Sequence, residues 1–150
     1  MIQVEEMIRR AQTDDACVLA ALAVQMWTDH DPDELGREFR ELLQKDDAAY
    51  FLAYADGRPI AFAQCQLRHD YVEGTDSSPV GYLEGVFVSE GFRMRGFAAE
   101  LLAACEIWAR EKGCAEFASD CELDNEDSRR FHMAVGFEEA NRVICFRKDL

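Results

Sequence analysis

The residues best suited to chemistry lie in one short segment, residues 86–98, which reads Val-Phe-Val-Ser-Glu-Gly-Phe-Arg-Met-Arg-Gly-Phe-Ala. An apolar strand runs into a loop with the motif Arg93-x-x-Gly96-x-Ala98, and a long amphipathic helix follows. The first N–H groups of such a helix have no partner within it, and Arg93 and Arg95 stand beside them. The segment therefore predicts a site for phosphate or pyrophosphate, although Gly96 alone is also typical of an ordinary turn.

Two acidic residues stand among apolar ones in the strands around this segment. Glu84 lies in the strand just before it, and Asp120 ends the apolar run Cys114–Cys121. A charged side chain in an apolar strand is costly to bury and usually has a task. A carboxylate at a strand end can bind an ammonium group and accept its proton, directly or through water. The alternative is that these acids only pair with Arg68 or Arg142.

The elements that position these residues alternate between strand and helix in the second half of the chain. A strand over Tyr82–Val88, a helix ending at Gly113, a strand over Cys114–Cys121, a helix capped by Asp124 or Asn125 and ending at Gly136, and a final strand over Arg142–Arg147 follow one another. Such alternation favours parallel strands joined by right-handed crossovers.

The first half is predicted to supply two helices and a hairpin. Thr13-Asp14-Asp15 begins a helix over Ala16–Met26, Asp31 and Pro32 begin a second helix, Asp56-Gly57-Arg58-Pro59 joins the strands Tyr50–Ala55 and Ile60–Leu67, and His69–Pro79 is a loop. With 150 residues the chain has the size of one domain, and these elements predict a mixed α/β sheet over residues 1–150.

The composition narrows the possible ligands. A net charge of −14 excludes nonspecific nucleic-acid binding through a basic surface and favours cationic ligands. Residues 1–12 lack the apolar segment of a signal peptide, and no apolar run approaches the roughly 20 residues of a membrane span. We therefore expect a cytoplasmic protein without a membrane partner.

The six cysteines show no spacing typical of a metal site, and we expect no metal. Five of them have mostly apolar neighbours, which predicts small core residues in a reducing compartment.

Several of these features together resemble the GNAT superfamily of acetyl-CoA-dependent N-acetyltransferases. The resemblance rests on Glu84 in a buried strand, Arg93-x-x-Gly96-x-Ala98, the following helix and strand, Asn125, and Gly136-Phe137. It implies an α/β fold with a mixed, mostly antiparallel sheet, a parallel central strand pair splayed at the acetyl-CoA site, and about four flanking helices.

Within that superfamily the chain resembles the aminoglycoside 6′-N-acetyltransferases. The segments that carry this closer match are Trp27-x-x-His30, residues 68–79, Leu83-Glu84-Gly85, Ala118-Ser119-Asp120, Phe131-His132 and Gly136-Phe137-Glu138-Glu139. The resemblance implies acetyl transfer from acetyl-CoA to the 6′-amine of a cationic aminoglycoside, antibiotic resistance, and a homodimer.

The resemblance also implies roles for individual residues. Backbone groups of Val86, Phe87 and Val88 would bind the pantetheine arm and polarise the thioester carbonyl, and the pyrophosphate would lie against Arg93, Met94, Arg95, Gly96, Phe97 and Ala98. Asn125 either caps its helix, contacts CoA or does both. The acceptor would be bound by Trp27, His30, Tyr71, Asp76, Glu84, Asp120 and Glu139. Core packing is the alternative for Trp27, and a solvated surface position is the alternative for Tyr71, Asp76 and Glu139.

The catalytic step requires a neutral amine, so we expect Glu84 first and Asp120 second as the group that takes its proton. Many superfamily members place a tyrosine seven residues after the asparagine, where this chain has His132. A thiol with a pKa of about 8.5 leaves without much help from an acid. His132 therefore either donates a proton or only packs.

Other functions are compatible with parts of this pattern. A polyamine or peptide amine would also suit an acidic cleft, and a non-catalytic module that binds acyl-CoA or a cation would need no turnover. The 69–79 loop favours aminoglycosides over peptides, and paired acids at strand ends favour catalysis. A kinase lacks support because no G-x-x-x-x-G-K-[ST] motif is present.

Overall fold

Five strands form a single sheet in the order β1-β2-β3-β4-β5. The computed structural model describes residues 6–150. The strands are β1 (Glu6–Arg10), β2 (Ala48–Ala55), β3 (Arg58–Arg68), β4 (Val80–Val88) and β5 (Phe117–Ser119). The first four pair antiparallel, and β4 and β5 pair parallel, which confirms a mixed, mostly antiparallel sheet with one parallel pair. Among the described residues this pair lies at the edge of the sheet and not at its centre.

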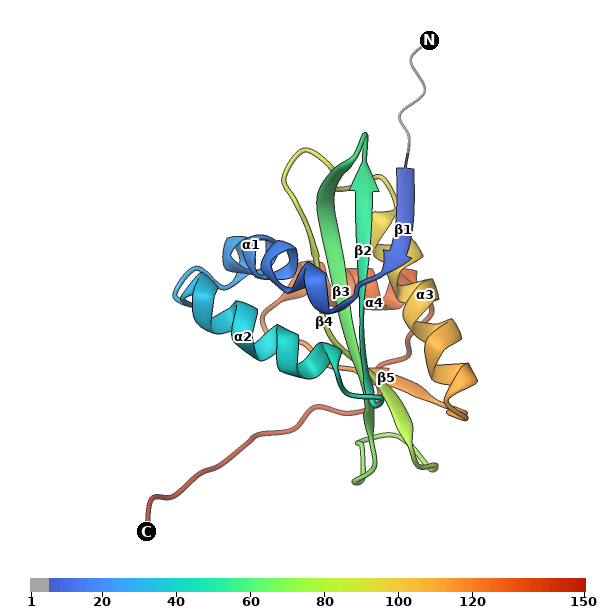
Figure 1. Ribbon diagram of the computed structural model, residues 1–150. Coiled ribbons are helices and arrows are strands. Elements are labelled where there is room, and N and C mark those ends of the chain that lie inside the picture. Colours follow the sequence, from blue (N-terminus) through green and yellow to red (C-terminus); the bar gives the residue numbers. More distant parts are fainter. Residues whose placement is uncertain (1–5) are drawn as a thin grey trace.

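Helices cover both faces of this sheet (Figure 1). They are α1 (Ala16–Met26), α2 (Pro32–Leu43), α3 (Phe97–Glu111) and α4 (Glu126–Ala134), and a 3₁₀ turn, Thr13–Asp15, precedes α1. One apolar core joins α1 and α2 to one sheet face through Leu19, Phe39, Tyr50, Leu52 and Phe62. The second core joins α3 to the other face through Phe51, Leu83, Leu101, Cys105 and Trp108.

Local signals explain most element boundaries. The backbone N–H of Asp33 donates to the Asp31 side chain at 3.2 Å, and Pro32 is the first residue of α2, so this helix begins where its cap predicts. The β2–β3 hairpin turns at Asp56 and Gly57, whose positive φ angles of 50° and 77° are those of the tight turns that join antiparallel strands. Residues 69–79 form a loop, as predicted.

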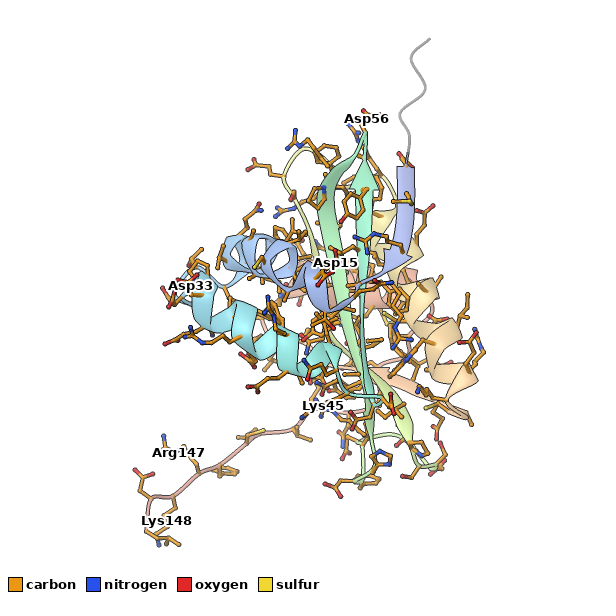
Figure 2. The ribbon with its side chains drawn as sticks, viewed as in Figure 1. Asp15, Asp33, Lys45, Asp56, Arg147 and Lys148 are labelled. Atoms are coloured by element: carbon orange, nitrogen blue, oxygen red, sulfur yellow. The ribbon has the colours of Figure 1, made fainter. Side chains whose placement is uncertain are left out.

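The prediction of a final strand over Arg142–Arg147 is wrong. Residues 137–150 contain no helix or strand and extend away from the sheet (Figure 1). Arg147 and Lys148 lie far out on this segment (Figure 2). The apolar run Val143-Ile144-Cys145-Phe146 is suited to a strand, but a strand also needs a neighbour to pair with, and the segment leaves its own sheet. Within the described residues β5 therefore lies at the edge of the sheet.

Two further expectations need correction. Strand β1 was missed because a short, charged edge strand has too few apolar residues to show an alternating pattern. The cysteine prediction is also wrong, since only Cys65 and Cys105 are buried, whereas Cys17, Cys121 and Cys145 are exposed. Apolar neighbours in the sequence do not decide which way a single small side chain faces.

Among residues 6–150, no helix is both long and apolar enough to cross a membrane. The same part of the chain contains no cluster of three or more His, Cys, Asp or Glu side chains arranged to hold a metal ion.

Candidate active site

β5 is much shorter than β4, so the second half of β4 has no neighbouring strand on that side in the part of the chain that the structure describes. β5 pairs with β4 only from Gly81 to Leu83, whereas β4 continues to Val88. Beyond Leu83 the backbone of β4 has no strand beside it on the β5 side among the described residues. Backbone groups of residues 84–88 that are not bonded to β3 are therefore available to a ligand that lies along the strand, whereas the Val88 carbonyl accepts a hydrogen bond from Arg93.

Glu84 sits at an irregularity in the β3–β4 ladder. Gln64 pairs with Gly85 and the next residue of β3, Cys65, pairs with Leu83, so Glu84 is the extra residue of a β-bulge. A bulge redirects a side chain and increases the local twist of the strand. Arg68 donates to the Glu84 carboxylate from two nitrogens: Nε lies 3.1 Å from Oε1, and Nη2 lies 2.9 Å from Oε1 and 3.0 Å from Oε2. This is the arginine pairing that the sequence left open as the alternative for this acid.

Asp120 has a different environment. The Tyr82 hydroxyl donates a hydrogen bond to its carboxylate, and no arginine or lysine pairs with Asp120 among the described residues. Burial of the phenol and its hydrogen bond to Asp120 raise the pKa of Tyr82. The Arg68 guanidinium lies 3.5 Å from the centre of the Tyr82 ring. The two acids are thus linked through one arginine and one tyrosine, both of which reach them from β3 and β4.

The loop before α3 has the geometry of an anion cradle. Gly96 is the N-cap of α3 with φ of 87°, and Met94 has φ of 64°. None of the backbone N–H groups from residue 93 to 96 donates to a protein acceptor within the described chain. A Cβ added at Gly96 would meet no atom within 4 Å, so the space in front of it is open. Exposed N–H groups at the N-terminus of a 15-residue helix attract phosphate.

The arginines of this loop are held by local contacts. Arg93 Nε donates to the Val88 carbonyl at 3.0 Å, and the Arg95 guanidinium lies 5.4 Å from the centre of the Phe92 ring. Phe97 is buried in the core beneath the loop, so it anchors the first turn of α3. Both arginines are largely exposed and keep donors free for an anion.

A cleft of about 310 Å³ opens on the sheet face covered by α1 and α2. Its lining consists of Trp27, His30, Leu35, Glu38, Phe39, Gln64 and Glu84. The structure therefore brings together three of the residues predicted to bind an acceptor, Trp27, His30 and Glu84. Glu38 and Gln64 were missed, although Gln64, like Glu84, is a polar residue within a largely apolar strand. A second hollow of about 360 Å³, between α1 and α2, contains none of the predicted site residues.

The other four predicted acceptor residues do not line this cleft. Asp120 directly follows β5, and the other three lie on the surface. Tyr71 and Asp76 are exposed on the loop before β4, where the Asp76 backbone N–H donates to Glu116 at 2.9 Å. Glu139 lies beyond α4 and pairs with both Arg142 and Arg129, which lower the pKa of its carboxyl group. Their placement corresponds to the solvated surface positions that the sequence left open.

His132 uses both of its ring nitrogens. Nδ1 lies 2.7 Å from the Ser128 carbonyl oxygen, which can only accept, so Nδ1 carries a proton. Nε2 lies 2.7 Å from the Ser119 hydroxyl, and the ring also contacts Phe131 and Phe137. The imidazole thereby joins α4 to the end of β5. Asn125 caps α4 by accepting a hydrogen bond from the Ser128 N–H at 3.1 Å.

Comparison with known proteins matches residues 16–137 to the acetyltransferase (GNAT) family. An aminoglycoside N(6′)-acetyltransferase type 1 from Salmonella typhimurium is 50% identical over 127 residues, which cover 85% of this chain and 88% of the relative. One of the same name from Stenotrophomonas maltophilia is 41% identical over 150 residues, covering 100% and 97% of the two chains.

Solved structures agree with these relatives. An aminoglycoside N-acetyltransferase, AAC(6′)-Iy, in complex with CoA superimposes with a TM-score of 0.95 at 44% identity, over 99% of this chain and 98% of the other. AAC(6′)-Iy has also been solved with the bisubstrate analogue CoA-S-monomethyl-acetylneamine, and that structure gives a TM-score of 0.93 over 97% of this chain and 99% of the other.

Proposed function

The chain belongs to the GNAT family of acetyltransferases, and from this membership we propose that it transfers the acetyl group of acetyl-CoA to the 6′-amino group of aminoglycosides. One geometric observation supports the reaction above all others. Two acids stand where β4 and β5 separate: Glu84 lies at the bulge in the middle of β4, and Asp120 directly follows β5. β4 then leads through a short loop into an anion cradle. This arrangement serves an anionic donor and a cationic acceptor at once.

The donor fits the residues that are present. The open N–H groups before α3, together with Arg93 and Arg95, are suited to the pyrophosphate of CoA. The edge of β4 at Val86 and Phe87, which has no strand beside it on the β5 side among the described residues, is suited to the amide-bearing pantetheine arm. Acetyl-CoA supplies a thioester whose acyl carbon reacts with an amine. The chain's own contribution is to hold this group beside the two acids.

The acids have separate tasks in our proposal. An acceptor amine with a pKa near 10 is protonated at neutral pH, and it becomes a nucleophile only when a base removes that proton. Asp120 accepts the proton, because its carboxylate is bound by a neutral phenol and not by a cation. Glu84 binds the incoming ammonium group, for which the Arg68 guanidinium must yield some of its hydrogen bonds.

Release of the CoA thiol tests this function. The full-length protein is incubated with acetyl-CoA and, in turn, with 6′-amino aminoglycosides, polyamines and basic peptides. Saturable release with the aminoglycosides only, with the product acetylated at the 6′ position, is the expected result. Turnover confined to polyamines or peptides would keep the fold and reject the acceptor. Binding of acetyl-CoA without turnover of any amine would reject the enzyme and leave a binding module.

We propose that the enzyme acts in the cytoplasm and gives resistance to aminoglycosides. Acetylation removes a positive charge from the antibiotic, and this would protect the cell that produces the enzyme. Expression in a susceptible bacterium should raise the inhibitory concentration of kanamycin, and expression of the Asp120→Asn variant should not. Equal protection by both proteins would contradict a role for the acetyl transfer.

A homodimer is the assembly we propose, with the C-terminal segment 137–150 in the interface. Val143, Ile144 and Phe146 are exposed by 64%, 81% and 91%, and together with Cys145 they form a continuous apolar run. Apolar side chains on an extended segment without a partner strand are a signature of association with another chain. A second copy offers the free edge of its own β5.

Light scattering after size-exclusion chromatography tests the assembly. The native chain should have twice its 17.1 kDa mass, and the double variant Ile144→Asp, Phe146→Asp should have the mass of a monomer. Ile107→Asp is the control, because Ile107 is an exposed apolar residue on α3, outside the segment. A native chain of monomer mass would reject the homodimer.

A further inference from the structure

Gln64, which lines the acceptor cleft, and Tyr50, its partner on β2, carry polar groups that have no hydrogen-bond partner among the described residues. The Tyr50 hydroxyl is fully buried and makes no hydrogen bond. Gln64 is 9% exposed, lines the cleft, and its side-chain amide has no hydrogen-bond partner within the described chain. Tyr50 and Gln64 occupy opposite positions in the β2–β3 ladder, so their side chains project from the same face of the sheet.

Unpaired groups of this kind are rare in a folded protein. A buried donor or acceptor loses its hydrogen bonds to water on folding, and most proteins replace those bonds internally. An amide left open at the bottom of a cleft is therefore a candidate contact for a ligand. It can donate two hydrogen bonds and accept two, which suits the hydroxyl and amino groups of a sugar.

The carboxylate of Glu38 also lines this cleft. Glu38 projects from α2, is exposed, and forms no ion pair in the part of the chain that the structure describes. Glu84 lines the same cleft but is already held by Arg68. The charges of Glu38 and Glu84 both reach Tyr50 and, after burial itself, contribute to raising the pKa of its hydroxyl group. The cleft thus offers one carboxylate near the reacting centre and a second, unpaired one away from the strand ends.

We propose that Glu38 and Gln64 form a second acceptor subsite. Glu38 binds an ammonium group of the acceptor other than the one that is acetylated, and the Gln64 amide binds a neighbouring hydroxyl group. The inference rests on the proposed function, since it assigns a place to the additional amines that distinguish an aminoglycoside from a simple amino sugar. It predicts that the enzyme prefers acceptors with several amines because of this subsite.

Calorimetric binding separates the subsite from catalysis. Kanamycin, which has several amines, and 6-amino-6-deoxyglucose, which has one, are titrated into the CoA-saturated full-length protein and its variants. Glu38→Gln should weaken kanamycin binding about 5-fold, the size expected for one partly exposed ion pair, and should leave 6-amino-6-deoxyglucose unchanged. Glu41→Gln removes the same charge from an exposed position of α2 outside the cleft, and it should change neither affinity.

Gln64→Leu gives an independent measurement. Loss of its hydrogen bonds to the ligand should weaken kanamycin binding about 2- to 10-fold. The melting temperature should not fall, because an apolar side chain of similar size replaces an amide that lines the cleft and makes no hydrogen bond to the described chain. An affinity unchanged in both Glu38→Gln and Gln64→Leu, or weakened equally by Glu41→Gln, would overturn the subsite.

Product analysis together with these binding measurements distinguishes a failure of the proposed reaction from a failure of the subsite. If the native protein binds kanamycin and the variants behave as expected but no acetylated product forms, the reaction is rejected and the subsite stands. If the product forms and the variants bind like the native protein, the subsite is rejected and the reaction stands.

Discussion

Tyr82 donates its hydrogen bond to Asp120 from β4, across the last paired residues of β4 and β5. The raised pKa of the phenol keeps its proton in place at neutral pH, so the phenol is a donor and Asp120 is the acceptor. The same ring supports the Arg68 guanidinium, which neutralises Glu84. One tyrosine therefore separates an acid that is paired with a cation from an acid that is not.

This difference predicts distinct kinetics for the two acids. Asp120→Asn should lower kcat about 100-fold at pH 7, the usual contribution of a positioned base. Its activity should then rise with pH, since more of the free amine loses its proton without help. Glu84→Gln should mainly raise the KM for the aminoglycoside. Steady-state rates from pH 6 to pH 9 measure both effects.

Tyr82→Phe provides the matched control for this pair, because it keeps the ring under Arg68 and removes only the hydrogen bond to Asp120. Its kcat should fall several-fold, less than in Asp120→Asn. If Glu84→Gln showed the larger loss of kcat and the stronger dependence on pH, Glu84 would be the base and the two roles would be exchanged.

The cradle before α3 yields a prediction about the donor. Gly96→Ala forces a side chain into φ near 87°, which costs about 1–2 kcal/mol for a residue with a Cβ. The loop should relieve this strain by shifting its N–H groups, and the KM for acetyl-CoA should rise about 10-fold. Gly57→Ala places the same strain in the β2–β3 turn and should change stability without changing that KM. Equal KM values in both variants would place the phosphates elsewhere.

His132 is predicted to be structural. Its two ring nitrogens contact Ser128 and Ser119, so no proton is left free for the departing thiol. His132→Phe keeps the aromatic contacts and should lower the free energy of unfolding by about 1–2 kcal/mol, with kcat changed by less than about 3-fold. Denaturant unfolding and thiol release measure the two quantities.

Ser119→Ala distinguishes the structural role from a catalytic one, because it removes one partner of the imidazole and leaves the ring. It should reproduce part of the lost stability. If turnover by His132→Phe instead fell by an order of magnitude and the alkaline limb of the pH profile disappeared, proton donation would be assigned to His132.

The sequence predicted the elements that carry strong local signals. The cap at Asp31, the turn at Asp56-Gly57 and the motif before α3 each require a particular residue type at a particular position, so their prediction did not depend on distant contacts. The segment 142–147 shows the opposite case. Its pattern is that of a strand, but whether it forms one depends on a partner that lies outside its own sheet.

The site was predictable where a residue broke its own local pattern. Glu84 is a charge among apolar residues and was found in this way, whereas Gln64 breaks the apolar run of β3 in the same way but carries no charge. Glu38 was not predictable, because a charged residue on an amphipathic helix is usually only solvated. Its position in the cleft follows from the packing of α2 on the sheet, which no short segment encodes.

Stability in acid depends on the pair of Arg9 and Asp15. Their side chains form two hydrogen bonds of 2.8 Å between β1 and the turn before α1, and the Asp15 carboxylate also accepts the Gln12 N–H. The hydrogen bond to Arg9, followed by that to the Gln12 backbone, lowers the pKa of Asp15. A carboxyl group with a lower pKa in the folded state stabilises the fold above its unfolded pKa of about 3.9, and this contribution is lost as the pH falls through the folded value.

Asp15→Asn should therefore lower the free energy of unfolding by about 1 kcal/mol at pH 7, a value reduced by the partial exposure of Arg9. The difference from the native protein should shrink as the pH falls below about 4. Urea unfolding at a series of pH values measures this difference, with Asp14→Asn as the control because its exposed side chain lies one residue away. A difference that stayed constant down to pH 2, or one that was equally large for Asp14→Asn, would show that the stabilisation does not come from the ionised pair.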